Sequence, residues 1–215
     1  MDYRRVVRDG YDRIAERYAY LVGGAGRTRG IAEQQERYIR WVLDALPAGS
    51  HVLDLGCGAG IPVAASLSAR FRVTGVDFSA VQLRLAHSNV PAAQLILGDM
   101  TTIEFRAASF DAVVAFWSII HVPRSGQQAV VHSIARWLRP GGLFVASMGV
   151  KSREVDVEND WLGVPMFWSH YDPARNRAMC ETAGFTVESD VIETVEDGVD
   201  GPETFQWLIA RRAGV

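Results

Sequence analysis

Cysteine, long apolar runs and surplus positive charge are all scarce in this sequence, and each shortage argues against a class of protein. The two cysteines, Cys57 and Cys180, lie far apart without a metal-ligand spacing, which argues against both a disulfide framework and a bound metal. Nowhere do eighteen apolar residues follow one another, and the charged N-terminal stretch lacks the apolar segment of a signal peptide. We therefore expect a soluble, cytoplasmic protein without a membrane partner.

Charge and length set two further limits. The formal net charge is −3 and the basic residues are scattered, so we expect no nucleic-acid partner. The 215 residues, 48% of them hydrophobic, suffice for one substantial core. No repeat, low-complexity tract or linker interrupts them, which predicts a single domain over residues 1–215.

Strand-like and helix-like segments alternate through the middle of the chain. Between helical patterns, short runs rich in β-forming residues occupy positions 51–56, 72–77, 93–99, 109–117 and 141–149. This alternation predicts βαβ units and a parallel sheet. One more helix and two strands, at residues 185–193 and 204–211, are expected to follow.

The N-terminal segment has a helical pattern of its own. Apolar residues between positions 2 and 20 recur every three or four residues, but Gly10 interrupts them, which predicts two short helices or one kinked helix. The glycine-rich stretch 21–30 is expected to be a mobile hinge. A second helix is expected over residues 31–46.

Three glycines follow the first predicted strand, within the stretch HVLDLGCGAGIP. In a doubly wound sheet this loop faces the ligand, and Gly56, Gly58 and Gly60 let the backbone approach it closely. A phosphate loop would need Gly-Lys-Ser/Thr, which is missing, and Ile61 stands where a dinucleotide fingerprint needs a third glycine or an alanine. Asp54 would repel a diphosphate, so its position favours a ligand that carries an ammonium group.

The stretch LDLGCGAG resembles motif I of the class I S-adenosylmethionine-dependent methyltransferases, and further motifs of that family follow in order. VTGVDFS ends the second strand in Asp77, where the family holds the ribose hydroxyls, and LGDM places Asp99 and Met100 where it reads the adenine. FDAVVAFW resembles the family's fourth strand, and RPGG its turn into the fifth. The resemblance implies S-adenosylmethionine as cofactor and S-adenosylhomocysteine as its product.

The resemblance also implies a fold and a set of cofactor-binding residues. The fold is a doubly wound α/β sheet of seven mixed strands, the last antiparallel, with an N-terminal helical lid. Tyr11 and Tyr18, in the family-like stretch YDRIAERY, would close this lid, although packing on the body is an alternative for Tyr18. The implied cofactor residues are Tyr11, Tyr18, Asp54, Gly56, Cys57, Gly58, Gly60, Asp77, Phe78, Asp99, Met100 and Phe116.

His121 is the candidate general base. It lies a few residues beyond the fourth predicted strand, and the ordinary pKa of imidazole lies close to neutrality. A structural role, as a helix cap or a wall residue, is the alternative. His132 stands between apolar residues of a predicted helix and is interpreted as structural.

An acceptor-binding cap is expected over residues 151–172, where the family often inserts one. Its aromatic and thioether side chains suit a flat or apolar acceptor, although the same density is compatible with a core. The acids of EVDVENDW favour either a basic acceptor or a solvated loop. The predicted acceptor-binding residues are Trp117, Trp161, Met166, Trp168, His170 and Tyr171.

The predicted activity is methyl transfer from S-adenosylmethionine to an oxygen, nitrogen or carbon atom of a small molecule, such as a natural product. Two alternatives use the same scaffold: a cyclase or other catalyst that does not use the methyl group, and a non-catalytic partner subunit. The predicted parts are a lid and helix over 1–46, a cofactor-binding core over 50–150, the cap over 151–172 and a C-terminal helix with strands over 173–215.

Overall fold

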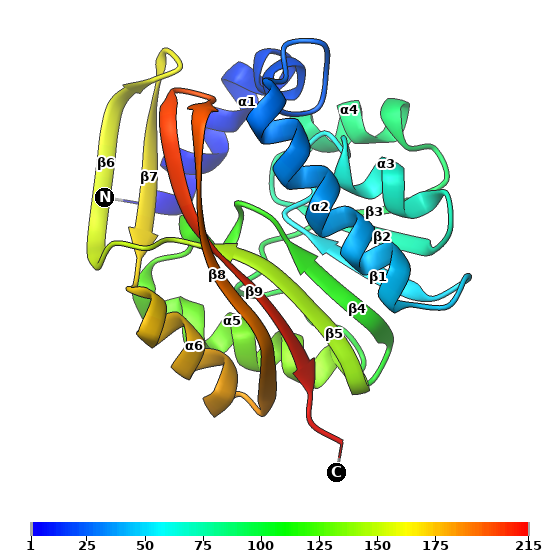
Figure 1. The fold of residues 1–215 in the computed structure, drawn as a ribbon. Coiled ribbons are helices and arrows are strands. Elements are labelled where there is room, and N and C mark those ends of the chain that lie inside the picture. The colour runs from blue at the N-terminus through cyan, green and yellow to red at the C-terminus, as the bar shows by residue number, and fades with distance from the viewer. Residues whose placement is uncertain (1, 215) are drawn as a thin grey trace.

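A central mixed sheet organises the computed structural model, which describes residues 2–214. Its strands are β1 (His51–Leu55), β2 (Arg72–Asp77), β3 (Gln94–Leu97), β4 (Phe110–Ala115), β5 (Leu138–Met148), β8 (Phe185–Gly198) and β9 (Gly201–Arg212). They pair in the order β3-β2-β1-β4-β5-β9-β8 (Figure 1). The first five are parallel, and β9 runs antiparallel to both neighbours. The predicted seven-stranded fold is therefore confirmed.

Helices cover both faces of this sheet. They are α1 (Tyr3–Val22), α2 (Arg29–Ala45), α3 (Val63–Ser68), α4 (Ala80–Asn89), α5 (Arg124–Trp137) and α6 (Pro173–Thr182), with a short 3-10 turn η1 (Ile119–His121). Ile134 of α5 and Met179 of α6 belong to one buried cluster, and Val42 of α2 and Leu67 of α3 belong to another. Within residues 2–214, no helix is long and apolar enough to cross a membrane.

The reversal of strand order lies between β1 and β4. The chain leaves β1 toward β2 and β3 on one side, and β4 and β5 lie on the other. Loops after neighbouring strands diverge at such a point, which opens a crevice at the carboxyl ends of the strands. The loops after β1, β2 and β4 therefore meet at one edge of the sheet.

A separate hairpin lies over this edge, formed by β6 (Arg153–Trp161) and β7 (Val164–His170). The acidic stretch EVDVENDW is thus a strand, and its interpretation as a solvated loop is wrong. α1 packs along the hairpin (Figure 1), and Val7 and Ile14 of the helix share a buried cluster with Met166 and Phe167 of β7. α1 and the β6–β7 hairpin therefore form one packed unit.

Gly10 does not interrupt the first helix, so the expected alternative of two short helices is wrong. α1 is continuous, and Asp2 caps it by accepting a hydrogen bond from the backbone N–H of Arg5. Gly10 faces β7, where a Cβ atom would lie 2.9 Å from the carbonyl oxygen of Pro165. The glycine allows the helix and the strand to approach closely, which offsets its low helix propensity.

The glycine-rich connection between α1 and α2 is closely packed. The Gln35 side-chain amide donates to the Val22 carbonyl at 2.9 Å, and Arg27 donates to the Gln35 Oε1 at 3.1 Å. A Cβ atom on Gly23 would lie 2.7 Å from the carbonyl oxygen of Ile61, in the loop after β1. The hinge stays a prediction, and opening it would break these contacts.

Candidate active site

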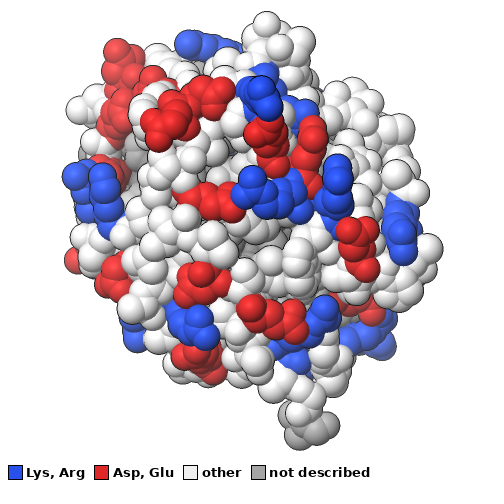
Figure 2. Space-filling view, in the orientation of Figure 1, with Lys and Arg blue, Asp and Glu red and all other residues white. Residues whose placement is uncertain are grey.

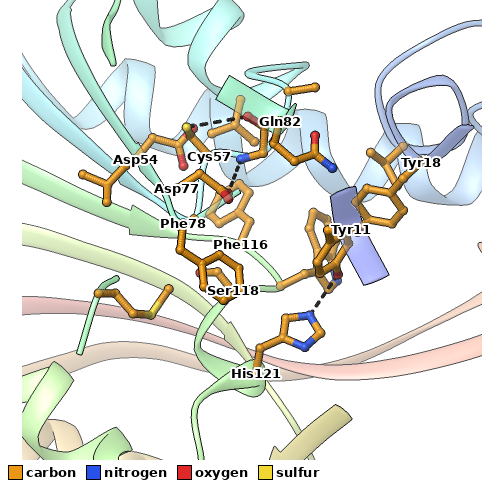
Figure 3. A pocket seen from close by; sticks show the side chains of 18 of the residues that line it. Tyr11, Tyr18, Asp54, Cys57, Asp77, Phe78, Gln82, Phe116, Ser118 and His121 are labelled. Atoms are coloured by element: carbon orange, nitrogen blue, oxygen red, sulfur yellow. Dashed lines mark hydrogen bonds between the residues drawn. The ribbon is translucent and has the colours of Figure 1, made fainter. Parts of the chain in front are cut away.

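A cavity of about 140 Å³ lies at the carboxyl ends of β1, β2 and β4. Figure 3 shows side chains from the loops after these strands and from α1 converging on it. The β1 loop runs along its wall, and Gly58 has a φ of +52°, which L side chains rarely adopt. The Gly58 backbone N–H donates to Asp77 Oδ2 at 2.9 Å, which joins the glycine loop to the end of β2.

Two carboxylates lie together on this first cavity. Asp77 also accepts from the backbone N–H of Ser79 at 2.9 Å, and burial raises its pKa to about 6 against the effect of these hydrogen bonds. Asp54 is 2% exposed, and its Oδ2 has no hydrogen-bond partner within the described chain. Burial first, and then the charge of Asp77, raise the pKa of Asp54 to about 7. Both side chains can accept further hydrogen bonds from a ligand.

Gln82, on the first turn of α4, adds a third acceptor that sequence reasoning missed. Its Oε1 is buried without a partner within residues 2–214, and the side chain lines the first cavity. An unpartnered buried oxygen is costly unless a bound molecule supplies a donor. Its place five residues after Asp77, on a helix that begins directly above the cavity, was the available signal.

Asp99 lies off the cavity wall, although Gly98, Met100 and Thr101 line it. Asp99 Oδ1 accepts from the backbone N–H and the hydroxyl of Thr101, at 2.8 and 2.7 Å. Its Oδ2 lies 3.5 Å from Arg4 of α1. The carboxylate thus shapes the turn after β3, and its predicted contact with adenine stays a prediction.

His121 makes two hydrogen bonds at the edge of the first cavity, one to Phe167 and one to Tyr11, and Figure 3 shows the bond to Tyr11. Its Nδ1 lies 2.8 Å from the carbonyl oxygen of Phe167, which can only accept, so Nδ1 carries the hydrogen. Nε2 therefore uses its lone pair to accept from the Tyr11 hydroxyl at 2.9 Å. Burial lowers the pKa of His121 to about 4, so the ring is neutral at pH 7.

Tyr11 and Tyr18 close the first cavity on the side of α1. Their rings meet edge to face at 5.1 Å, and both lie within 6 Å of the Trp161 ring centroid. Burial raises the pKa of Tyr11 well above its ordinary value, so its hydroxyl remains a donor toward His121. Tyr11 and Tyr18 thus line the cavity, and their predicted closure over a cofactor stays a prediction.

A second cavity, of about 380 Å³, adjoins the first. It lies between α1, α2, the β6–β7 hairpin and the protruding ends of β8 and β9. The residues that line both cavities are Tyr11, Tyr18, Val22, Gln35, Trp117 and His121. Trp117 has a φ of +50° and donates its backbone N–H to Ser147 Oγ at 2.6 Å, which holds its side chain at this boundary.

The structure separates the predicted acceptor-binding residues. Trp117, Trp161, Trp168 and His170 line the second cavity. Met166 does not, because it is fully buried beneath Gly10 of α1, and Tyr171 lies instead against Arg124, whose guanidinium is 4.7 Å from the ring centroid. These two residues lie outside both cavities.

Most of the predicted cofactor-binding residues lie at the first cavity. Gly60 faces Val90 and Ala86 of the α4 region and lines neither cavity. The others, apart from Asp99 and Gly60, line the first cavity: Tyr11, Tyr18, Asp54, Gly56, Cys57, Gly58, Asp77, Phe78, Met100 and Phe116.

Comparison with known proteins agrees with this geometry. A family model described as a methyltransferase domain matches residues 52–142, which include the glycine loop and Asp77. Over 99% of the chain, the fold matches the magnesium protoporphyrin IX methyltransferase of Synechocystis PCC 6803, solved with bound SAM, with a TM-score of 0.76 and 18% identity over 98% of that chain. Residues 52–142 thus match a methyltransferase domain, and the whole chain has the class I methyltransferase fold.

Two further proteins are similar to this chain, and their names indicate different activities. Methyltransferase GfsG of Streptomyces halstedii is 35% identical over 137 residues, which are 59% of the chain and 49% of that protein. The [4+2]-cyclase SpnF has a similar fold, with a TM-score of 0.72, 18% identity and coverage of 97% of the chain and 95% of its own. The chain spans about half the length of the curated relatives that it matches.

Proposed function

We propose that this chain transfers the methyl group of S-adenosylmethionine to a small molecule and releases S-adenosylhomocysteine. One observation carries the proposal: a cavity with two unpartnered buried oxygens, on Asp54 and Gln82, meets a second cavity at a neutral His121. When bound, S-adenosylmethionine supplies both the methyl group and a good leaving group. The protein must then exclude water and align the acceptor atom.

The first cavity suits the donors of this cofactor. Asp77 has lone pairs left for two ribose hydroxyls, because each of its oxygens accepts a single backbone N–H. Asp54 and Gln82 offer acceptors to an amino group or a hydroxyl. Met100 and Phe78 provide apolar wall for the flat adenine.

His121 is placed to receive a proton from the acceptor. Its Nδ1–H is held by the Phe167 carbonyl, which leaves Nε2 as the basic atom. The Tyr11 hydroxyl occupies that lone pair, so an acceptor hydroxyl would replace Tyr11 as the donor. His121 would then act as base only with the acceptor in place.

The deciding experiment follows labelled methyl groups. Purified protein is incubated with methyl-labelled S-adenosylmethionine and a panel of phenols, alcohols and amines, and both labelled product and S-adenosylhomocysteine are measured. The proposal expects the two in equal amounts. A product without S-adenosylhomocysteine would indicate the cyclase alternative, and binding without turnover on any acceptor would indicate the partner subunit.

Binding of S-adenosylhomocysteine should strengthen as pH rises from 6 to 8. With a pKa of about 7, Asp54 changes from mostly protonated to mostly ionised over this range and then attracts the ligand's ammonium group. Together with Asp77, whose pKa is about 6, this predicts a gain of roughly ten- to twentyfold in calorimetric affinity.

Asp54→Asn should bind S-adenosylhomocysteine more weakly than the parent protein does. Its affinity should change only about twofold between pH 6 and 8, because of these two carboxylates only Asp77 still titrates. Asp44→Asn, at an exposed position of α2, is the matched control and should behave like the parent. Parent affinity that does not change between pH 6 and 8 would contradict this role of Asp54.

Residues 1–24 are expected to form a lid that closes on the cofactor. Among the side-chain contacts that hold α1 in place are those from Tyr11 to His121 and from the Ser79 hydroxyl to Asp12, and ligand binding should stabilise them. Trypsin cleavage at Arg27 and Arg29 should slow when S-adenosylhomocysteine is added. Asp77→Ala should show no such protection, and equal cleavage of the parent with and without ligand would rule out the lid.

The remaining expectations about partners are part of the same proposal. Curated relatives such as the 2-methyl-6-phytyl-1,4-hydroquinone methyltransferase of Synechocystis carry names of small-molecule enzymes, which supports a small-molecule acceptor. The lack of a nucleic-acid partner and the cytoplasmic location stay predictions from the sequence.

A further inference from the structure

The second cavity has flat aromatic walls. Trp117 follows β4, Trp161 and Trp168 belong to the β6–β7 hairpin, and Phe205 lies on β9. The Trp161 and Trp168 rings meet edge to face at 5.5 Å, and Trp161 also packs against Tyr11 and Tyr18, so these rings form one aromatic wall. Such walls suit a planar, apolar molecular body, and the faces of tryptophan rings also attract cations.

The charges around this cavity do not balance. Arg153 contacts both Asp156 oxygens at 3.1 Å, so these two residues neutralise each other. Of the remaining charged lining residues, only Lys151 is basic, whereas Glu158, Asp200 and Glu203 are acidic. None of these three acids has an ion-pair partner in the part of the chain that the structure describes. The cavity therefore has an excess of negative charge.

Acidic side chains also gather outside the cavity. Figure 2 shows them clustered over the tips of the β6–β7 and β8–β9 hairpins, and residues of both hairpins also line the second cavity. Charge of one sign around an opening concentrates molecules of the opposite sign. A cationic molecule would thus be attracted to this opening, and an anionic one repelled.

Glu203 is the acid placed deepest among these groups. Its Oε1 accepts from the backbone N–H of Val199 at 2.9 Å, which fixes the carboxylate at the base of the β8–β9 turn. Burial raises the pKa of Tyr18, at the boundary of the two cavities, and the negative charge of Glu203 raises it further. Burial raises the pKa of Glu203 itself, a cost that a neighbouring cation would offset.

We propose that the acceptor of this second cavity has a flat apolar body and a protonated amine, with the body between the tryptophans and the amine against Glu203. This inference rests on the proposed methyl transfer, because it names the class of acceptor that the same site would take. It also separates the recognised ammonium group from the atom that receives the methyl group, which must lie near His121.

The test uses three probes with one aromatic body: 2-(2-naphthyl)ethylamine, 2-(2-naphthyl)ethanol and 2-naphthylacetic acid. Their binding is measured at pH 7.5 by quenching of tryptophan fluorescence, with S-adenosylhomocysteine at saturation. We expect the amine to bind at least about tenfold more tightly than the alcohol, and the acid to bind most weakly. The acidic side chains that line the cavity should attract the ammonium group and repel the carboxylate. The preference for the amine should shrink as ionic strength rises.

Glu203→Gln should reduce the preference for the amine over the alcohol to within about threefold, while S-adenosylhomocysteine affinity stays at the parent value. Glu196→Gln, an exposed acid of the same hairpin that does not line the cavity, should keep the full preference. The inference is overturned if the alcohol or the acid binds as tightly as the amine, if no probe binds at millimolar concentration, or if Glu203→Gln retains the preference. Failure of S-adenosylhomocysteine to bind would instead contradict the proposed function.

Discussion

Asp77→Ala is expected to abolish measurable binding of S-adenosylhomocysteine in calorimetry. The substitution removes the proposed acceptor for two ribose hydroxyls, and losing two hydrogen bonds to a charged group costs about 3 to 6 kcal/mol. It also removes the partner of the Gly58 and Ser79 backbone N–H groups, which loosens the glycine loop that forms the cavity wall. Affinity should therefore fall by at least about a hundredfold.

Asp99→Ala is the matched control for this experiment. Asp99 follows the neighbouring strand, but its carboxylate bonds to Thr101 and lies off the cavity wall. Asp99→Ala should therefore reduce the affinity for S-adenosylhomocysteine less than Asp77→Ala does. Thermal unfolding should show that both variants fold, and a folded Asp77→Ala with parent affinity would refute the assignment.

His121→Ala is expected to lower kcat about a hundredfold or more when the acceptor is a phenol or an alcohol. Such an acceptor must lose its proton as the methyl group arrives, and Nε2 of His121 is the basic atom at the boundary of the two cavities. The affinity for S-adenosylhomocysteine should change little. An amine acceptor that attacks through its own lone pair should instead retain most of the rate.

The pH profile distinguishes a base from a structural residue. Burial lowers the pKa of His121 to about 4, so kcat at saturating cofactor should not fall as pH drops through about 6.5, where an ordinary histidine becomes protonated. The fall in kcat that reports protonation of His121 should appear only as pH falls toward 4, and this fall should be missing in His121→Ala. His132→Ala, at an exposed position of α5, should leave both kcat and the profile unchanged.

The low pKa of His121 also makes the stability of the folded protein depend on pH. In the unfolded chain His121 titrates near 6.5, whereas in the folded protein it stays neutral down to about 4. The unfolded state therefore binds more protons between these values, so this residue contributes stability that is lost as pH falls from about 6.5 to about 4. His121→Ala should remove that part of the pH dependence of unfolding. If instead its only effect were lower stability at every pH, with kcat unchanged, His121 would be a wall residue.

Several features of the site could be predicted because they are local in sequence. The turn after β1 requires positive φ, and the glycines that permit it stand directly after an apolar strand. Asp77 ends the next strand, and parallel strands bring their carboxyl ends to one edge, so alternation alone places it beside that turn. Periodicity and turn chemistry act over a few residues, and a single sequence displays them directly.

Tertiary structure alone decided the rest. The hydrogen-bond chain of the proposed base joins Tyr11, His121 and Phe167, which are 110 and 46 residues apart, and no local pattern records that meeting. Met166 belongs to the same aromatic segment as Trp168, yet one is buried beneath Gly10 and the other lines a cavity. The two residues are two apart on β7 and so share one face of the strand, and only the packing of α1 against the hairpin decides which of them is covered. Cavity walls are made by side chains from distant segments, so their composition follows from packing and not from the order of residues.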